Sequence, residues 1–276
     1  MVVVKVAHTP DADDAFMFHG MLSGKVPLPR GLQIEHVVED IESLNQKALA
    51  GALEVTAVSF HAYAHIFSKY RILSAGASVG DGYGPIIVAK RGMKLEDVER
   101  GVVLVPGKLT TAFLVLKLRF PKLRFKLERF DRIPDAVASG KAPAGVLIHE
   151  GQLTFAKSGL RKLLDLGDWW ENETSLPLPL GTNVVRRDVP NPELMCRALR
   201  DSVKYALENR EEALGTAMKY GRGMTKQEAM KFVGMYVNAF TVDLGERGKR
   251  GVKELLGRAH SEGITPSMPP LDYVEA

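Results

Sequence analysis

Short β-rich runs alternate with helical patterns over the first two-thirds of this 276-residue chain. Such alternation is typical of βαβ units around mostly parallel sheets, so the sequence predicts an α/β fold. At this length one large or two medium units are expected, and a 45% hydrophobic content is enough to fill them. The predicted strands are Val2–Ala7, Ile34–Val38, Val55–Val58, Ile72–Ser78, Pro85–Ala89, Val102–Val105, Phe125–Arg129, Ala144–Ile148 and Asn183–Arg187.

The last third of the chain changes character, because its apolar residues recur only at helical spacing after a helix start at Asn191 and Pro192. This tail has no predicted strand of its own, so we expect it to pack back on the first βα unit. The sequence therefore predicts a discontinuous first lobe, residues 1–92 and 188–276, and a second lobe, residues 93–187. Two crossings between the lobes make a hinge, and they are expected near residues 90–94 and 183–188.

Charge and cysteine content exclude several classes of partner and site. The formal net charge is only +4, and Lys and Arg are spread among acidic residues, so nucleic-acid binding is not expected. The densest basic run, residues 117–129, alternates with Leu and Phe, which favours a helix end and then a strand with one solvated face. A single cysteine, Cys196, excludes an internal disulfide, and its apolar neighbours indicate a helix core position.

The N-terminus enters a short β-branched run directly, without the basic region, long apolar region and cleavage site of a secretion signal. No window approaches the ~20 apolar residues of a membrane span. We therefore expect a cytoplasmic protein. The sequence carries no signal for its oligomeric state.

The strand predicted at Ala144–Ile148 stops abruptly at His149 and Glu150 and then turns through Gly151. Ligands of open α/β sheets bind just past the carboxyl ends of strands, which makes His149 the candidate catalytic residue. The alternative is a half-buried His bonded to backbone. Glu150 either orients His149 or faces solvent, and the alternation of side chains along a strand favours solvent.

Three other strand ends carry loops with hydroxyl, carboxylate or glycine groups. In the first loop, Asp11, Asp13 and Asp14 precede a predicted helix, where capping is a better explanation than a metal site. In the second, Ser59 can donate to a substrate oxygen. His61 and His65 are four residues apart, but no Glu follows His61, so zinc is not expected. The third, residues 80–85, is a glycine-rich turn without a dinucleotide fingerprint.

A further loop, after the strand Val102–Val105, places Thr110 and Thr111 at the start of a helix. Free N–H groups and two hydroxyls at a helix N-terminus suit a carboxylate or phosphate. The spacing is not that of a P-loop, and an ordinary N-cap explains the threonines equally well. No Ser-His-Asp elbow, CxxC pair or nucleotide motif occurs in the sequence.

Seven of these segments occur in the order and spacing of the 1,4-dihydroxy-6-naphthoate synthase family of the futalosine pathway to menaquinone, which the chain resembles over nearly its whole length. They are HTPDADDAFMF, VSFHAYA, GDGYGPIIVAK, VPGKLTTA, LIHEGQLTF, LGDWWE and LPLPLGTN.

This resemblance implies an α/β, two-lobed type II periplasmic-binding-protein-like fold with a central cleft. It implies a lyase that converts cyclic dehypoxanthine futalosine to 1,4-dihydroxy-6-naphthoate by proton abstraction and C–C cleavage, with no cofactor and no metal. The proton acceptor of the family falls on His149. Its substrate contacts fall on Ala57, Val58, Ser59, Thr110 and Thr111.

One departure concerns Asp13, since family members commonly carry Asn there. A carboxylate that faced the cleft would repel a substrate carboxylate, so Asp13 is expected to cap the helix instead. Two alternative functions remain. They are a sibling enzyme resembling chorismate dehydratase and a non-catalytic solute-binding protein of the same fold.

Overall fold

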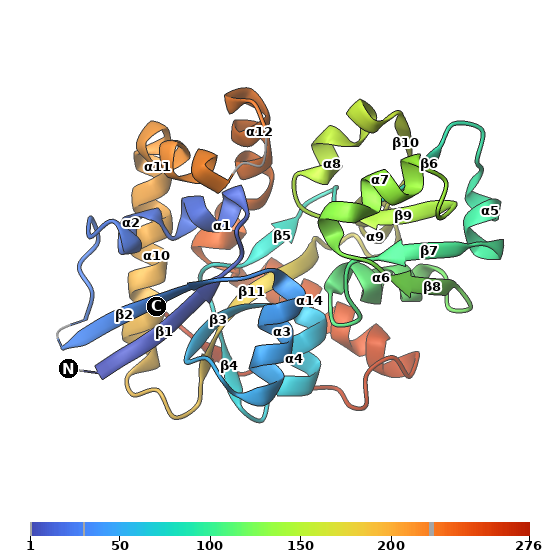
Figure 1. The fold of residues 1–276 in the computed structure, drawn as a ribbon. Helices are drawn as coiled ribbons and strands as arrows, with labels where there is room; N and C mark the ends of the chain where they lie inside the picture. Colours follow the sequence, from blue (N-terminus) through green and yellow to red (C-terminus); the bar gives the residue numbers. More distant parts are fainter. Residues whose placement is uncertain (1, 30, 221–223) are drawn as a thin grey trace.

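Within residues 2–29, 31–220 and 224–276, which the computed structural model describes, the chain forms two β-sheets with helices around them (Figure 1). The first sheet has the strand order β12-β4-β11-β3-β1-β2, and β5 pairs with β11 beside this path. Its strands are β1 (Val2–His8), β2 (Leu32–Val38), β3 (Val55–Ser59), β4 (Tyr70–Leu73), β5 (Ser78–Gly80), β11 (Leu178–Arg186) and β12 (Tyr273–Val274).

The second sheet has the strand order β10-β6-β9-β7-β8 and is built from one continuous stretch of chain. Its strands are β6 (Ile86–Lys90), β7 (Val102–Val105), β8 (Arg124–Leu127), β9 (Ala144–Leu147) and β10 (Leu160–Asp165). Both sheets are mixed rather than mostly parallel, because β6, β10 and β11 run antiparallel to their neighbours. The α/β fold class is confirmed.

The helices cover the sheets as the amphipathic patterns predict. Those of the first half are α1 (Ala12–Met17), α2 (His19–Leu22), α3 (Ile41–Ala50), α4 (Phe60–Ile66), α5 (Leu95–Arg100), α6 (Thr111–Arg119) and α7 (Ile133–Ala138). The others are α8 (Gly151–Thr154), α9 (Leu166–Thr174), α10 (Pro192–Glu208), α11 (Arg210–Ala217), α12 (Lys226–Tyr236), α13 (Ala239–Val242) and α14 (Gly245–Ser261). Within the described residues, no helix is both long and apolar enough to span a membrane.

The chain crosses between the two sheets at other residues than the sequence predicts, as the sheet in which each strand lies shows. β6 pairs with β9 and β10 in the second sheet, and β11 pairs with β3 and β4 in the first, so the chain crosses over residues 81–85 and 166–177. The crossings expected near 90–94 and 183–188 are each wrong by one strand. β11 begins inside a proline-rich run that resembles a turn, and the strand accommodates the run through a register shift between Pro179 and Gly181.

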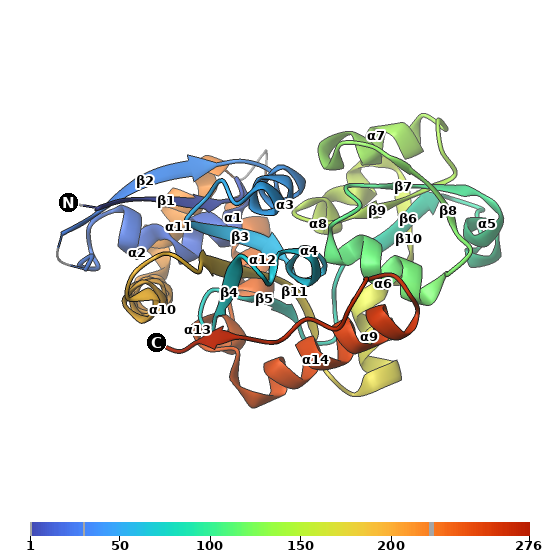
Figure 2. The same cartoon turned by 90° about the horizontal axis from the view of Figure 1, so that it is seen from below.

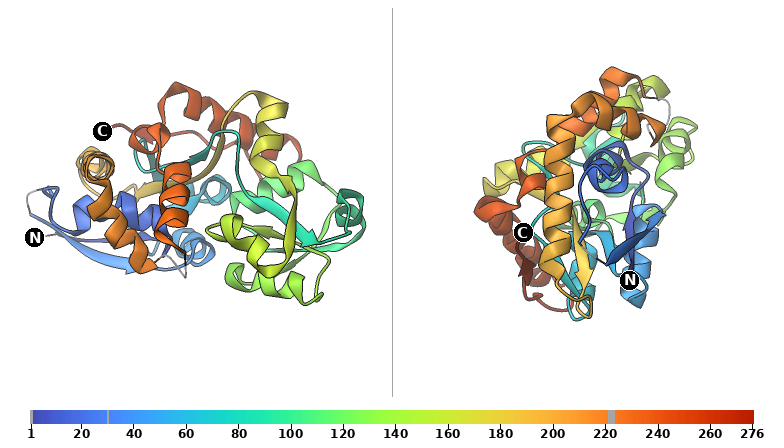
Figure 3. Two further views of the ribbon diagram at one scale, coloured as in Figure 1. Left: turned by 90° about the horizontal axis from the view of Figure 1, so that it is seen from above. Right: turned by 90° about the vertical axis from the view of Figure 1, so that its left-hand side faces the viewer.

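The helical tail packs against the first βα unit, as expected. Figure 3 shows α10 running alongside the N-terminal helices. The hydroxyl of Ser202 on α10 donates to the Met17 carbonyl at 2.7 Å and accepts from the Met21 N–H at 2.9 Å. Gly20 permits this approach, because a Cβ there would lie 3.1 Å from the Ser202 backbone. Cys196 is fully buried in the same core, which confirms its predicted position.

The tail also contains β12, which contradicts the expectation that it has no strand. This strand pairs in parallel with β4, and two residues are too few to show any periodicity in the sequence. Figure 2 shows α14 lying under both lobes and the chain after it returning to the first lobe. The apolar side of α14 enters the same buried cluster as α4 and α6, so one hydrophobic core holds the two lobes together.

Three more differences concern strands. The predicted strand Ile72–Ser78 is two strands, β4 and β5, separated by a turn at Gly76. β10 was not predicted, because a register shift between Lys162 and Leu164 breaks its alternation of apolar and polar residues. The basic run forms the end of α6 and then β8, whose residues are mostly exposed, as expected. Division of the chain into discontinuous lobes stays a prediction.

Candidate active site

A cavity lies between the sheets, lined by the loops that follow the carboxyl ends of β1, β3, β7 and β9. It holds about 700 Å³ including the open solvent at its mouth. All the residues expected to act on or bind a substrate line this cavity, namely Ala57, Val58, Ser59, Thr110, Thr111 and His149.

His149 stands just past β9 with a backbone φ of 60°, in the left-handed region. A residue other than glycine rarely adopts that conformation, and the cost is of order 1–3 kcal/mol. The Phe130 ring packs edge-on against the imidazole, with the ring centroids 4.7 Å apart. The surroundings of His149 therefore hold its side chain at the cavity wall against a backbone preference.

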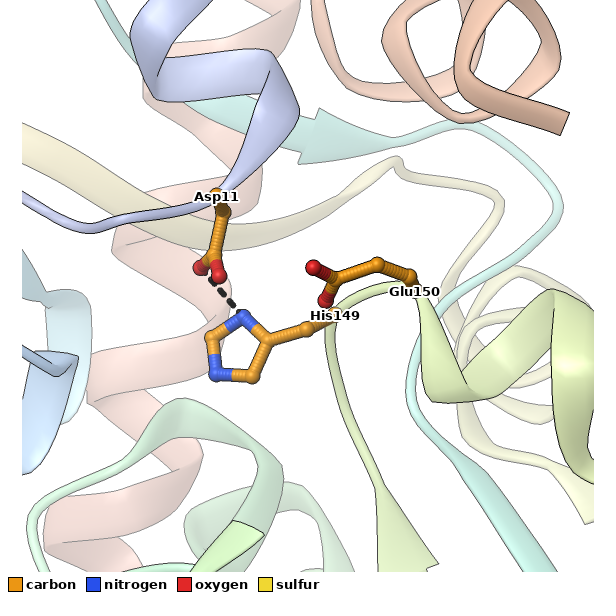
Figure 4. A group of neighbouring side chains, drawn as sticks. All are labelled: Asp11, His149 and Glu150. Carbon is orange, nitrogen blue, oxygen red and sulfur yellow. Dashed lines mark ion pairs between the residues drawn. The ribbon is translucent and has the colours of Figure 1, made fainter. Parts of the chain in front are cut away.

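The imidazole Nδ1 of His149 forms an ion pair with Oδ2 of Asp11, which comes from the loop after β1 (Figure 4). The two side chains are only 10% and 5% exposed, so water screens their interaction weakly. Asp11 is the N-cap residue of α1, but its side chain makes no capping hydrogen bond. The capping role expected of Asp11 is therefore wrong, since its carboxylate turns to the histidine instead.

Glu150 is buried, and its carboxylate lies on the same side as Asp11 and His149 (Figure 4). The expectation of a solvent-facing side chain is wrong because β9 ends at Leu147, so strand alternation does not extend to this residue. One ligand atom from each of Asp11, His149 and Glu150 lies within 4.8 Å of the others. This set could hold a divalent cation, which prefers such oxygen and imidazole ligands.

The neighbouring carboxylates are buried in the same loop. The Thr9 hydroxyl lies 2.8 Å from an oxygen of both Asp11 and Asp14, and the Thr9 N–H donates to Asp14 at 2.8 Å. Asp13 lines the cavity, so the expectation that it turns away from the cleft is wrong, although its carboxylate bonds its own N–H in the first turn of α1. Burial, and then the charges of Asp14 and Asp11, hold the pKa of Asp13 well above its usual value. Burial also raises the pKa of Asp14.

Ser59 ends β3 at the cavity and is held by Asn45 on α3. The Asn45 amide donates to the Ser59 hydroxyl at 3.2 Å and accepts the Ser59 N–H at 2.9 Å. Asn45 is fully buried, and both partners are thereby satisfied. Sequence patterns gave no signal for Asn45, because a lone Asn in an amphipathic helix resembles many surface residues.

Thr110 is the N-cap of α6 and Thr111 is its first residue, and both hydroxyls form hydrogen bonds within the protein. Thr110 Oγ1 accepts from the Phe113 N–H at 3.2 Å and donates to the Gly107 carbonyl at 2.9 Å, so it is the N-cap. Thr111 Oγ1 donates to the Leu180 carbonyl on β11 at 2.5 Å, across the sheets. The N–H groups of Thr111 and Ala112 are the first of the helix, which have no acceptor within it. An anion at this end of the cavity would meet them.

His61 and His65 do not line the cavity. Their rings lie 5.6 Å apart, and His61 Nδ1 lies 3.3 Å from the Thr110 carbonyl. Burial, with a smaller effect from His65, lowers the pKa of His61 to about 4. Of the glycine-rich turn at 80–85, only Pro85 lines the cavity, so this turn serves mainly as a crossing between the sheets.

The sequence did not predict a polar pair at the cavity that joins α8 to α12. The Tyr236 hydroxyl on α12 donates to Gln152 Oε1 on α8 at 2.6 Å, and both residues line the cavity. Gln152 lies one helical turn after His149, which is the only sequence signal it offers. Gly76, Ser78, Thr182 and Asn183 also line the cavity.

Two α/β lobes around a ligand cavity define a protein of the periplasmic-binding-protein-like fold. The alkanesulfonate-binding protein SsuA from Xanthomonas axonopodis pv. citri, solved with MOPS bound, superposes with a TM-score of 0.75 at 10% identity. That match covers 100% of this chain and 99% of SsuA, and it establishes the fold alone.

Sequence comparison narrows the class to one family. A family model described as menaquinone biosynthesis matches residues 4–261. The chain belongs to this family, and it is an enzyme similar to 1,4-dihydroxy-6-naphthoate synthases. The synthase of Thermus thermophilus is 39% identical over 274 residues, or 98% of this chain and 99% of the relative. That of Streptomyces coelicolor is 33% identical over 275 residues, or 97% and 96%.

A solved structure shares the fold at higher identity. Protein AF1704 from Archaeoglobus fulgidus superposes with a TM-score of 0.90 and is 49% identical. The match covers 95% of this chain and 98% of that one.

Proposed function

We propose that this cavity converts cyclic dehypoxanthine futalosine to 1,4-dihydroxy-6-naphthoate, with His149 as general base. The observation that best supports this proposal is the position of His149. It lies at the cavity wall beside a buried carboxylate, and hydroxyl and N–H donors line the same cavity. The names of the relatives at 39% and 33% identity supply the product, 1,4-dihydroxy-6-naphthoate. No cofactor enters the proposed reaction.

The proposed chemistry follows from the imidazole. A neutral histidine accepts a proton near neutral pH, and removing one beside the reacting ring lets the C–C bond to the sugar-derived part of the substrate break, so that this part leaves as the ring gains aromaticity. Ala57, Val58 and Ser59 form one wall for the substrate. The N-terminus of α6, with Thr110 and Thr111, receives its carboxylate.

The direct test is turnover. Purified protein is mixed with cyclic dehypoxanthine futalosine, and the release of 1,4-dihydroxy-6-naphthoate is followed by mass spectrometry. Loss of water from chorismate instead would favour the sibling dehydratase. Binding of a small molecule with no turnover would favour a solute-binding protein.

Substitution of His149 tests the base. His149→Asn keeps size and some hydrogen bonding but cannot accept the proton, so kcat should fall at least ~100-fold. His65→Asn, outside the cavity, is the matched control and should keep wild-type kcat. A folded His149→Asn protein that retains more than a tenth of wild-type kcat would eliminate His149 as the base.

A further inference from the structure

The partner of His149 comes from the other sheet. Asp11 follows β1 of the first sheet and His149 follows β9 of the second, so their ion pair spans the cavity (Figure 4). The carboxylate oxygen that meets the imidazole is also 2.8 Å from the Thr9 hydroxyl. Thr9 therefore holds the carboxylate in place from its own loop.

The identity of the contacting atoms decides which ring nitrogen is the base. An ionised carboxylate only accepts hydrogen bonds, so the Asp11 contact selects the form of His149 with its proton on Nδ1. Nε2 then carries the lone pair. A carboxylate in this position fixes both the tautomer and the ring orientation, as in the Ser-His-Asp triad.

Two further polar contacts join the same short segment to the first lobe. From the α8 segment, defined here as residues 149–157, Gln152 accepts from Tyr236 at 2.6 Å and Lys157 pairs with Glu228 at 2.7 Å. Tyr236 and Glu228 both lie on α12. Together with the Asp11–His149 ion pair, these two contacts join the first lobe to the α8 segment at three points along its length.

We propose that Asp11 is the positioning residue for His149, and that closure of the two lobes on the α8 segment brings the pair together. This inference rests on the proposed role of His149 as base. When the lobes separate, Asp11 leaves with the first sheet and His149 with the second. The Phe130 ring then stays against His149, and the orienting contact of Asp11 is present only while the cavity is closed.

The kinetic test compares two aspartates that occupy helix N-caps in the same lobe. Asp11→Asn keeps the shape of the side chain but can donate to Nδ1 and select the wrong tautomer. We expect kcat to fall at least ~100-fold with KM within about threefold of wild type. Asp40→Asn is the matched control. Asp40 caps α3 outside the cavity, and Asn caps a helix equally well, so its kcat and KM should stay at wild-type values.

The outcomes separate this inference from the proposed function. If His149→Asn is inactive while Asp11→Asn keeps more than a third of wild-type kcat, Asp11 does not position the base. If His149→Asn is active, the proposed function itself fails. If Asp11→Asn does not fold, Tyr236→Phe tests the role of closure instead. This variant leaves Asp11 and His149 intact and removes a neighbouring contact across the cavity. We expect its kcat to fall about 3- to 10-fold, and an unchanged kcat would overturn the role of closure.

Two measurements test closure and the alternative of a metal. Hydrogen exchange of residues 149–157 should slow when 1,4-dihydroxy-6-naphthoate binds wild-type protein and slow less in Asp11→Asn, whereas equal protection in both would overturn the coupling. Dialysis of the wild type against EDTA should leave kcat unchanged. A loss that a divalent cation restores would overturn the dyad and assign Asp11, His149 and Glu150 to a metal site.

Discussion

At the scale of single residues, the cavity concentrates buried charge. Asp11, Asp13, Asp14 and Glu150 are each less than a tenth exposed, and all lie within or beside two short loops. A raised pKa means that Asp13 holds its proton more readily than an exposed aspartate does. The repulsion expected between Asp13 and a substrate carboxylate is correspondingly weakened.

Asp13→Asn should therefore stabilise the protein. A carboxyl whose folded pKa is raised contributes stability below its unfolded pKa near 3.8 and loses that contribution as the pH rises through the folded pKa. We expect the Tm at pH 7 to rise by ~2–4 °C, equivalent to about 1 kcal/mol in a chain of this size, and the gain to shrink toward pH 5. Thermal melts at both pH values check this.

Asp135→Asn is the matched control, because Asp135 is exposed in the first turn of α7 as Asp13 is buried in the first turn of α1. Equal Tm changes in the two variants would show that burial of the Asp13 carboxylate does not lower the stability of the protein.

At the scale of elements, the N-terminus of α6 combines a cap with a proposed anion site. Thr110 satisfies one N–H of the helix, and Thr111 ties α6 to β11. The two interpretations left open by the sequence thus apply to different residues. Thr110 is the cap, and because the Thr111 hydroxyl donates its proton to the Leu180 carbonyl, the proposed contact with a substrate carboxylate falls to the first N–H groups of the helix.

Replacing both threonines with Val should raise KM about tenfold or more, because it removes the cap and the tie to β11 that hold the first N–H groups of α6 at the cavity, and a hydrogen bond to a charged group contributes ~1.5–3 kcal/mol. Thr110→Val alone should lower stability by about 1 kcal/mol through loss of the cap. Thr110→Ser, which keeps a capping hydroxyl, is the control. Steady-state kinetics and melts separate these effects, and an unchanged KM in the double variant would show that the start of α6 does not bind the substrate carboxylate.

At the scale of the whole molecule, a histidine lies between the lobes. His61 on α4 of the first lobe meets the Thr110 carbonyl of the second. Because burial lowers its pKa to about 4, the native protein keeps His61 neutral where the unfolded chain would bind a proton. His61 therefore packs against the start of α6 as an uncharged imidazole at neutral pH.

Acidic pH should lower the free energy of unfolding, because His61 gains a proton on unfolding. A depressed folded pKa contributes stability that is present above the unfolded pKa of 6.5 and is lost as the pH falls to about 4, up to about 3 kcal/mol. His61→Gln should show a shallower loss of stability across that window in urea unfolding. His260→Asn, at an exposed position, should follow the wild type. Parallel slopes for wild type and His61→Gln would exclude His61 as the source.

The sequence by itself determined the fold class and which chemical groups follow several of the strands. Strand periodicity and helix-start signals are local, and they placed Ser59, Thr110, Thr111 and His149 at positions that line one cavity. Only the tertiary structure decided the sheets joined by β6 and β11, the strand β12, the burial of Glu150 and the pairing of Asp11 with His149. Each of these depends on contact between segments far apart in the chain or on where a strand stops in the folded protein, and local patterns of polarity carry no information about either.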